Sequence, residues 1–485
     1  MITKEIVHKH LLFFKSKIEK KILTHDYKSA IQFLKLFARM AYRYNLFYTD
    51  EEAEQFVSII SNALIGKKQI KQKTNKIVFY DSFAIDNRGL THQYLRAIFS
   101  WDSELLFITH ADIQPDVLNE LKEYPKTQIL FYDESNINTF RDVVDRIVDF
   151  APEKVLLHFS PWDIAGFCIF NSLENVDRFL INLTDHAFWL GKSSCDYVLE
   201  FRAYGSYLSV AERKIPIQKL LLQPYYPIIS KSPFAGFPFD KGNLVIAFAG
   251  SNFYKIAGRD NTFLKLIKEV LNQNPNVIFV LAGNGNRLPI EKFIEQNKFE
   301  NRFYLLGNRR DISSMIVSID IYVNTFPLIG GLMSQYAAYY HKPIIGYTDS
   351  DLYSFNDVED LLQIPREKLL VKDTKETFVD YFNKLIEYQE VRSENVRRTY
   401  CAIPSPEHFN TQLKQNMFEY KYAIYESFTK TVSFDKQSII DLYLDIENTY
   451  NNNHYWTIFM HLKFKSILYF PWETLKVLMK RCIYG

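Results

Sequence analysis

The stretch LVIAFAGSNFYKIAGRD, residues 244–260, indicates the fold class of this chain. It begins with a continuous apolar run, which is typical of a buried parallel strand. The run ends in a turn that contains Gly, Asn and Lys, and the next segment, NTFLKLIKEVLNQ (261–273), has apolar residues at helical spacing. A buried strand that leads through a polar turn into a helix is the repeating unit of α/β proteins.

Similar runs fall into two groups, and amphipathic segments of helix length separate several of them. The first group is NKIVFYDSF (75–83), LLFITH (105–110), TQILFYD (127–133), KVLLHFS (154–160), RFLINLTDH (178–186) and DYVLEF (196–201). The second group is LVIAFAG (244–250), NVIFVLAG (276–283), RFYLLG (302–307), IDIYVNTF (319–326) and KPIIGY (342–347). We therefore predict two Rossmann-like, doubly wound lobes.

The segment between the two groups, QPYYPIISKSPFAGFPFDKGN (223–243), is rich in Pro and Gly and is the best candidate for a linker. The residues before the first group read as helices, with an apolar stripe at Ala30, Leu34, Phe37 and Ala41. The predicted organisation is an N-terminal helical cap (1–73), a first lobe (74–232), a second lobe (241–400) and C-terminal helices that pack back on the lobes (401–485).

Composition excludes several classes of protein. The net charge of +2 gives no reason to expect nucleic acid as a partner. The four cysteines form no CxxC pair, which excludes a zinc ribbon and favours a reducing, cytoplasmic compartment. We expect no membrane span and no signal peptide. No GxGxxG follows the first strand of either group, so we expect no dinucleotide cofactor.

Two tandem lobes of this kind occur in periplasmic-type binding proteins, in epimerases and in GT-B glycosyltransferases. In open α/β sheets, ligands bind outside the carboxyl ends of the strands. In the second lobe these exits read AGSNFYK (249–255), AGNGN (282–286), LGNRRDI (306–312) and NTFPLIGGLMS (324–334). A helix that starts after Gly330 and Gly331 offers unpaired N–H groups to an anion, and Lys255 adds a charge suited to a diphosphate. The alternative is a tight turn beside a solvated lysine.

Two segments of the second lobe resemble a known family. They are AFAGSNFYKIAGRDNTFLKLIKEVLNQNPNVIFVLAG (247–283) and DIYVNTFPLIGGLMSQYAAYYHKPIIGY (320–347). Both are similar to the donor half of GT-B glycosyltransferases, particularly the branch that contains the O-linked N-acetylglucosamine transferases. The matching residues are Asn252, Lys255, Ile256, Asp320, Thr325, Pro327, Gly330, Gly331 and Pro343.

The resemblance implies a glycosyltransferase that uses a nucleoside-diphosphate sugar, of the UDP type, as co-substrate. Lys255 would contact the diphosphate, with Asn252 holding the loop. The candidate donor-binding residues are Asn252, Lys255, Arg259, Gly283, Asn284, Gly330, Gly331, Leu332, Met333 and Ser334. Leu332 and Met333 replace polar residues of the family, and its Glu-x7-Glu pattern is missing, which leaves inversion or retention open.

We expect no required metal or other cofactor. The segment TDSDLY (348–353) contains Asp-x-Asp, the metal-binding signature of GT-A glycosyltransferases. It follows a strand of the second lobe, which is the wrong context for that chemistry, so we expect a loop or helix-capping role. No other cluster in the sequence has metal-ligand spacing.

The first lobe should hold the acceptor and a catalytic base. Asn87, Arg88 and Gly89 follow its first strand, and Asp185 and His186 follow a later one. His186 is the preferred base because imidazole titrates near neutral pH, while Asp185 either acts as the base itself or orients the substrate. The alternative is that His186 caps a helix or packs under Trp189. His158 and Asp163 are weaker candidates, and His92 is expected to be structural.

Residues 461–485 contain five Lys or Arg and one acid, and Trp472, Leu475, Leu478, Met479 and Cys482 share a helical face. This basic amphipathic helix either contacts an anionic bilayer or docks on the protein's own lobes. The N-terminal helices are either a cap or a surface for a protein partner. Our leading hypothesis is a bacterial glycosyltransferase, cytoplasmic or peripheral at the inner face of the membrane. Its acceptor would be a surface glycan on a lipid carrier or a protein. The alternatives are a non-catalytic sugar-nucleotide-binding subunit and a two-lobed epimerase.

Overall fold

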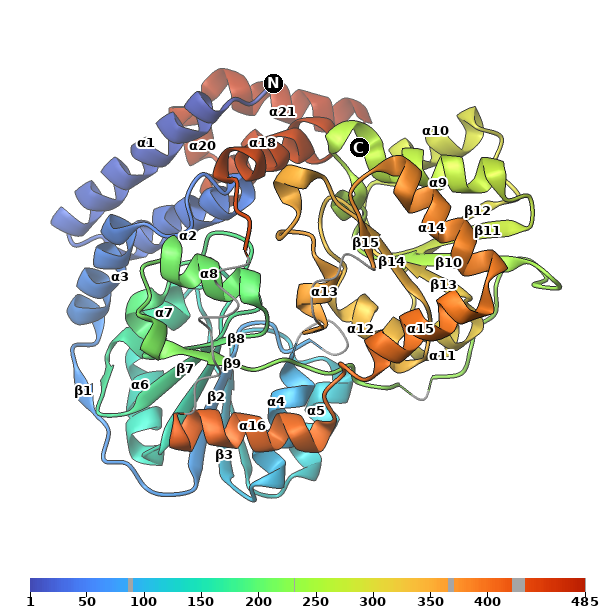
Figure 1. Cartoon of the computed structure of the whole chain (residues 1–485). Coiled ribbons are helices and arrows are strands. Elements are labelled where there is room, and N and C mark those ends of the chain that lie inside the picture. The colour runs from blue at the N-terminus through green and yellow to red at the C-terminus, as the bar shows by residue number, and fades with distance from the viewer. Residues whose placement is uncertain (86–89, 231, 365–369, 421–431, 485) are drawn as a thin grey trace.

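The computed structural model describes residues 1–85, 90–230, 232–364, 370–420 and 432–484, with side chains up to residue 479. Two parallel sheets, each covered by helices, form two lobes that face each other (Figure 1). Helices from both ends of the chain lie side by side at the top of that view. The predicted α/β class with two doubly wound lobes is confirmed.

The sheet of the first lobe has seven strands in the order β4-β3-β2-β5-β7-β8-β9. The strands are β2 (Lys76–Asp81), β3 (Glu104–Thr109), β4 (Thr127–Phe131), β5 (Lys154–His158), β7 (Asp177–Ile181), β8 (Tyr197–Glu200) and β9 (Leu220–Leu222). Its helices are α4 (Thr91–Ser100), α5 (Pro115–Glu123), α6 (Thr139–Phe150), α7 (Ile164–Asn171) and α8 (Ala203–Ala211).

The sheet of the second lobe has six strands in the order β12-β11-β10-β13-β14-β15. They are β10 (Val245–Gly250), β11 (Val277–Ala282), β12 (Phe303–Gly307), β13 (Ile321–Val323), β14 (Ile344–Tyr347) and β15 (Val371–Lys372). The helices are α9 (Thr262–Gln273), α10 (Leu288–Gln296), α11 (Ile312–Ser318), α12 (Gly331–Tyr339), α13 (Val358–Leu361), α14 (Lys375–Glu387) and α15 (Gln389–Tyr400).

Burial on both faces explains why apolar runs predicted these strands. Every residue of β11 is buried, because α helices cover both sides of a parallel sheet. Each of the eleven predicted runs contains a strand. The sequence analysis missed β9 and β15, which are too short to give a pattern, and the two-residue strands β1 (Lys68–Gln69) and β6 (Leu173–Glu174).

The first part of the predicted linker is packed against the second lobe. Tyr225 and Tyr226 are buried, and the backbone oxygen of Tyr225 accepts a hydrogen bond from Gln335 Nε2 of α12 (2.7 Å). The Tyr336 hydroxyl donates to the backbone oxygen of Ile228 (2.5 Å). The connection therefore helps to place α12 relative to the first lobe.

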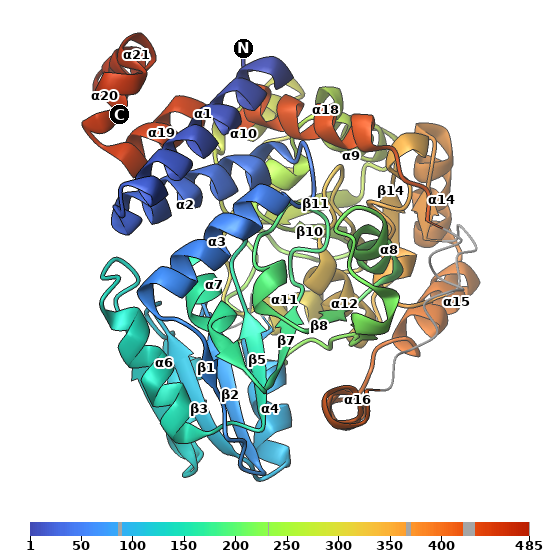
Figure 2. The ribbon, with the colours of Figure 1, turned by 90° about the vertical axis from the view of Figure 1, so that its left-hand side faces the viewer.

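The end of the described chain returns to the first lobe and to the N-terminal helices. Helix α16 (Pro406–Glu419) lies on α4, where Phe409 packs against Tyr94 and Tyr226. The next helices are α18 (Lys436–Ile446), the π-helix η6 (Glu447–Asn451), α19 (His454–Leu462), α20 (Lys465–Tyr469) and α21 (Pro471–Tyr484). They lie beside α1 (Lys4–Leu23), α2 (Tyr27–Tyr44) and α3 (Glu51–Leu64), as Figures 1 and 2 show.

Buried polar contacts tie these two groups of helices together. His10 Nδ1 lies 2.8 Å from His454 Nε2, and His454 Nδ1 lies 2.6 Å from the Tyr44 hydroxyl. The backbone N–H of Ile2 donates to Asn448 Oδ1, and Asn448 Nδ2 donates back to the Ile2 oxygen. The first and last helices therefore form one layer, and α18 and η6 of this layer also contact the second lobe.

Gly283, at the end of β11, provides a stability test. Its φ is +151°, and a Cβ built on it would lie 1.7 Å from the backbone oxygen of Ser251. We expect Gly283→Ala to destabilise the fold by about 3 kcal/mol or more, because neither backbone can move without breaking the strand exits. Gly307→Ala is the control: its φ is +65° but no atom lies within 4 Å of the added Cβ. That variant should lose only about 1–2 kcal/mol. Equal melting temperatures for the two variants would contradict the prediction.

Candidate functional site

The candidate site lies where the carboxyl edges of the two sheets meet. Arg202, which follows β8, donates from Nη1 to the backbone oxygen of Phe355 in the second lobe (3.2 Å). The carboxylate of Asp360 in α13 accepts hydrogen bonds from the N–H groups of Ala203 and Tyr204 at the start of α8, both at 3.0 Å. These contacts bring the polar strand exits of the two lobes together.

Lys255 lies directly after β10 on a 3-10 turn, η3 (Phe253–Ile256). Its Nζ donates to the backbone oxygen of Ile329 (2.9 Å), which precedes α12. Burial lowers the pKa of Lys255 to about 8; Arg202 lowers it as well, and Asp185 opposes them. Lys255 is thus a half-buried cation of the second lobe within electrostatic reach of the first.

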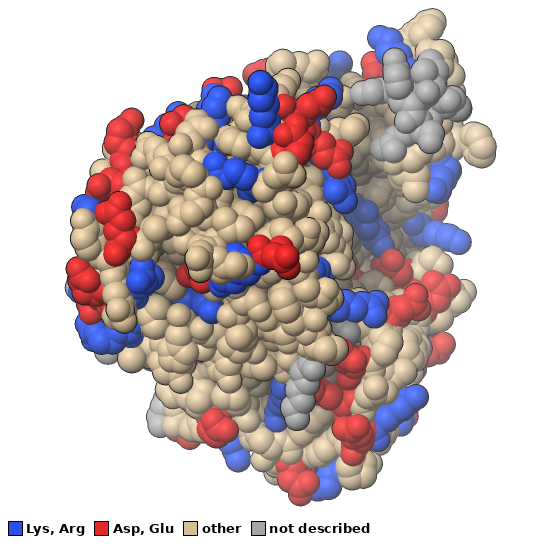
Figure 3. Space-filling view, turned by 90° about the vertical axis from the view of Figure 1, so that its right-hand side faces the viewer, with Lys and Arg blue, Asp and Glu red and all other residues tan. Residues whose placement is uncertain are grey.

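The charge on the side of the molecule drawn in Figure 3 is mixed. Figure 3 shows Lys and Arg side chains interspersed with Asp and Glu around a broad uncharged area. No wide basic surface is visible on this one face.

The start of α12 lies beside the carbonyl that Lys255 contacts. Gly330 caps the helix, and its N–H donates to Asn324 Oδ1 (3.1 Å). A Cβ on Gly330 would lie 2.9 Å from the Tyr322 hydroxyl, so close packing requires glycine there. The N–H groups of the first turn, beginning with Gly331, have no partner within the helix and favour a negative ligand.

The three predicted donor-binding residues that follow Gly331 differ in how deeply they are buried. Leu332 and Met333 are half-buried, and Met333 covers the end of β10, with its Cε 3.0 Å from a Cβ built on Gly250. Ser334 is fully buried, and its hydroxyl donates to the Gly330 oxygen (3.2 Å). The Ser334 side chain therefore stabilises the helix start and is not exposed to a ligand in this structure.

Arg259 is engaged by the Asp-x-Asp segment. Its Nη2 donates to Asp351 Oδ2 (2.7 Å), its Nη1 lies 3.7 Å from Asp349 Oδ2, and its backbone N–H donates to Asp445 of α18 (2.7 Å). In this structure the two carboxylates therefore pair with Arg259 and hold two loops of the second lobe together. A donor contact by Arg259 stays a prediction, and it would require the arginine to exchange or share Asp351.

Asn252 and Asn284 line a polar pocket beside η3. The pocket has a volume of about 520 Å³, and no charged residue lines it. Its walls come from the exits of β10 and β11 and from η6 and the residues after it: Asn252, Tyr254, Asn284, Gly285, Asn286, Tyr450, Asn451 and Asn453. Gly285 leaves room for Tyr450, whose hydroxyl donates to the Asn286 oxygen (3.2 Å). Amide and phenol groups of this kind suit an uncharged, hydroxyl-rich ligand.

Asp185 and His186 follow β7 in the first lobe, and Asp185 forms a buried ion pair with Arg202. Arg202 Nε donates to Asp185 Oδ2, Nη2 donates to Oδ1 (3.2 Å), and each side chain is 1% exposed. Burial would raise the pKa of Asp185, but the charge of Arg202 and the hydrogen bonds from His186 and Arg202 hold it well below its usual range. This carboxylate is therefore a weak base and a strong orienting group.

The side chain of His186 is more exposed than that of its neighbour Asp185. Its side chain is 29% exposed, Nδ1 lies 3.2 Å from Asp185 Oδ1, and its ring contacts Phe355 edge to face at 6.3 Å between centroids. Burial lowers the pKa of His186, Asp185 opposes the shift, and Arg202 and Lys255 add to it. A neutral imidazole held through Nδ1 leaves Nε2 to accept a proton.

The sequence analysis missed Arg202. The signal was present, because Arg202 follows the strand-like run DYVLEF just as Asp185 follows RFLINLT. Its buried carboxylate partner and its contact with the second lobe could not be read from the sequence. Asn87, Arg88 and Gly89, the predicted acceptor-side residues, lie outside the described residues.

Other candidate histidines of the first lobe have structural partners. His158 is fully buried and lies 3.1 Å from Asp81. His92 is also buried and lies 3.0 Å from Glu120 of α5, in agreement with the structural role expected for it.

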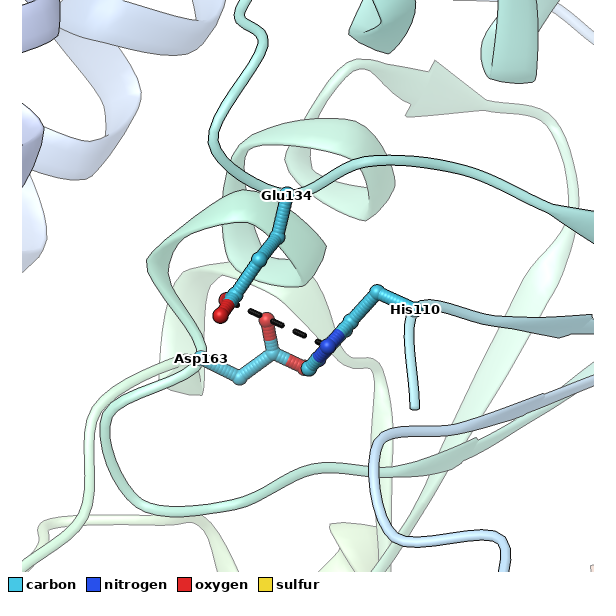
Figure 4. A group of neighbouring side chains, drawn as sticks. All are labelled: His110, Glu134 and Asp163. Atoms are coloured by element: carbon cyan, nitrogen blue, oxygen red, sulfur yellow. Dashed lines mark ion pairs between the residues drawn. The ribbon is translucent and has the colours of Figure 1, made fainter. Parts of the chain in front are cut away.

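One group with metal-ligand chemistry occurs among the residues that the structure describes: His110, Glu134 and Asp163 (Figure 4). His110 Nε2 lies 3.7 Å from Asp163 Oδ2, and Nδ1 lies 4.0 Å from Glu134 Oε2. Both carboxylates have other partners, because Lys35 contacts both oxygens of Glu134 at 2.7 Å and the Tyr80 hydroxyl donates to Asp163 (2.6 Å). These partners make the group a self-neutralised ion network, separate from Lys255.

No protein-family model and no curated protein matches the chain. Solved structures do match it. HepE of Anabaena, in complex with UDP and glucose, has 13% identity and a TM-score of 0.51 over 71% of this chain and 99% of its own. A mutant O-GlcNAc transferase of Thermobaculum terrenum has 13% identity and a TM-score of 0.53 over 88% and 85%. A putative UDP-N-acetylglucosamine 2-epimerase of Listeria monocytogenes has 11% identity and a TM-score of 0.52 over 72% and 98%.

At these identities the similarity concerns the fold. It confirms that the chain has the GT-B type of architecture, in which two Rossmann-like lobes face each other.

The Asp185–Arg202 pair leads to a stability prediction. We expect Asp185→Asn to lower the free energy of unfolding by about 3–5 kcal/mol near neutral pH, because the Arg202 guanidinium would be left buried without a counter-charge. The folded-state pKa of Asp185 is depressed, so its contribution is present above its unfolded pKa of about 3.9 and is lost as pH falls through the folded-state pKa. Urea titrations at several pH values measure this.

Asp196→Asn is the matched control, because Asp196 also pairs with an arginine, Arg178, but is 32% exposed. It should cost only about 0–1 kcal/mol. Equal losses in the two variants would contradict a special role for the buried pair.

Proposed function

We propose that this protein is a glycosyltransferase that moves a sugar from a nucleoside-diphosphate sugar, of the UDP type, to a hydroxyl acceptor. The observation that carries the proposal is the arrangement of Lys255 on one lobe and of Asp185 and His186 on the other, at facing strand exits. HepE, whose fold is similar, is in complex with UDP and with UDP-glucose in solved structures, which supports the donor class.

Lys255 and the start of α12 would bind the diphosphate. As the glycosidic bond breaks, the leaving nucleoside diphosphate gains negative charge. A fixed ammonium group and unpaired helix N–H groups stabilise that charge more than they stabilise the bound donor, and this difference accelerates the reaction. In the proposed reaction these groups do this without a metal ion.

His186 would act on the acceptor. Nδ1 faces Asp185, so Nε2 would take the proton from the acceptor hydroxyl as the oxygen attacks the sugar. Asp185 would hold the ring and stabilise the imidazolium that forms. Arg202 would keep Asp185 ionised and in place.

The acceptor class proposed here is a glycan intermediate, on a lipid carrier or free, or a protein side chain. The uncharged pocket of asparagines and tyrosines next to Lys255 supports a sugar-containing ligand. A peripheral position at the inner face of a membrane is part of the proposal and rests on the exposed surface of the C-terminal helices.

Two alternatives remain distinguishable by one assay. An epimerase is considered because a putative one in Listeria monocytogenes has a similar fold. It would convert the donor sugar with no acceptor, and a non-catalytic subunit would bind the donor unchanged. A glycosyltransferase would release UDP slowly from the donor, and an added acceptor would accelerate the release.

The first functional prediction concerns Lys255. UDP at 100 times its dissociation constant should stabilise the wild type by about 2.7 kcal/mol in a thermal-shift assay. Its affinity should fall as pH rises through about 8, because the Lys255 amine then loses its charge. Lys255→Arg should remove this pH dependence, and Lys255→Ala should slow turnover by about 10²–10³. Lys292→Ala, an exposed change on α10, is the control. If no nucleoside diphosphate shifts the melting temperature, the donor site is misassigned.

The second functional prediction concerns His186. We expect His186→Ala to slow sugar transfer by about 10²–10⁴ with UDP affinity nearly unchanged, because the donor is held by the other lobe. The wild-type rate should fall in acid, below pH 6.5, as the imidazole becomes protonated, and the variant's residual rate should lack this limb. His8→Ala, at an exposed position of α1, is the control. Normal transfer by both His186→Ala and Asp185→Asn would rule out this base.

A further inference from the structure

The C-terminal helices expose a row of large apolar side chains. Phe464 is 83% exposed, Leu468 77% and Trp472 73%. Met460, Leu475 and Met479 continue the row on α19 and α21 and are also exposed. Several large apolar side chains exposed within twenty residues are typical of an interaction site, because folded chains seldom leave such groups together in water.

The opposite side of the same helices is anchored to the body of the protein. The rings of Tyr469 and Phe470 pack on Phe13 of α1, each at 5.4 Å between centroids, while Ser466 and Thr474 are buried. Figure 2 shows α20 and α21 projecting beyond the rest of the chain next to α19. The helices are thus held by one face, and the apolar row lies on the outer one.

The exposure of three stripe residues argues against docking of the whole stripe on the lobes, although Leu478 is half-buried and the side chain of Cys482 lies outside the described residues. Trp472, Leu475 and Met479 do not dock on the protein's own lobes. The row also extends beyond the predicted stripe through Phe464 and Leu468.

The charge beside the row is predominantly positive. Lys463, Lys465 and Lys476 are exposed beside the apolar side chains, and Glu473 is the single acid between residues 461 and 485. A second copy of the chain, docked through the same surface, would bring these lysines against their own equivalents. An anionic surface would complement them.

We propose that residues 460–479 dock the protein on an anionic lipid bilayer. The apolar row enters the boundary between headgroups and acyl chains, and the lysines contact the headgroup phosphates. None of the described helices is long and apolar enough to cross a bilayer, so the contact is interfacial. This proposal deepens the peripheral location given in the proposed function. Its biological role rests on that function, but lipid binding itself can be measured without sugar transfer.

Sedimentation with vesicles tests the proposal. The wild type should bind vesicles of phosphatidylcholine mixed with phosphatidylglycerol and should bind pure phosphatidylcholine much more weakly. The combined variant Phe464→Ser, Leu468→Ser and Trp472→Ser should bind more than about tenfold more weakly. Changing Lys463, Lys465 and Lys476 together to Gln should weaken binding on the order of a hundredfold. Leu288→Ser is the matched control, because Leu288 is 62% exposed on α10 of the second lobe.

A second measurement requires no destabilising change. Brominated lipids should quench part of the fluorescence of the wild type, and Trp472→Phe should remove the quenched part while binding persists. Equal binding to both vesicle types, unchanged binding by the serine variant, or absence of quenching would overturn the proposal. So would vesicle-free self-association that the serine variant abolishes, because a second copy would then be the occupant. UDP affinity, measured in parallel, should be the same in all these variants, so loss of lipid binding is separable from failure of the donor site.

Discussion

The buried ion pair between Asp185 and Arg202 is the interaction on which the candidate site depends. Two charges removed from water repay their desolvation only when geometry and additional hydrogen bonds are favourable. Here Arg202 contacts both carboxylate oxygens and donates to the second lobe at Phe355, while Asp185 holds His186. One pair therefore fixes the histidine, keeps a carboxylate ionised and joins the two lobes.

Much of the fold could be predicted because parallel strands are buried on both faces. A strand buried on both faces, such as the one in 276–283, is apolar at nearly every position, so it can be recognised from the sequence alone. The same topology brings every strand exit to one edge, which is why Lys255, Asp185 and His186 could be chosen by their place after a strand. The choice required no knowledge of their contacts.

Contacts between distant elements could not be predicted. The sequence makes Arg259 a candidate donor-binding residue, but it does not show that Asp349 and Asp351, which follow a different strand, pair with it. Ser334 is a candidate because it lies in the strand exit NTFPLIGGLMS (324–334), and only the folded helix start shows that its hydroxyl donates to Gly330. The sequence predicts an apolar stripe on the last helix, but the exposure of Trp472, Leu475 and Met479 depends on how Tyr469 and Phe470 meet α1, which the sequence does not show.

The layer formed by the first and last helices also constrains how the chain folds. His10 contacts His454, and Ile2 contacts Asn448, and more than four hundred residues of sequence separate the members of each pair. Contacts of such separation in sequence are typical of slowly folding topologies. During synthesis the first three helices leave the ribosome long before their partners exist, with Phe14 and Tyr44 still uncovered. The cap can therefore be completed only after the last helices of the chain have been made, although its own helices come first in this sequence.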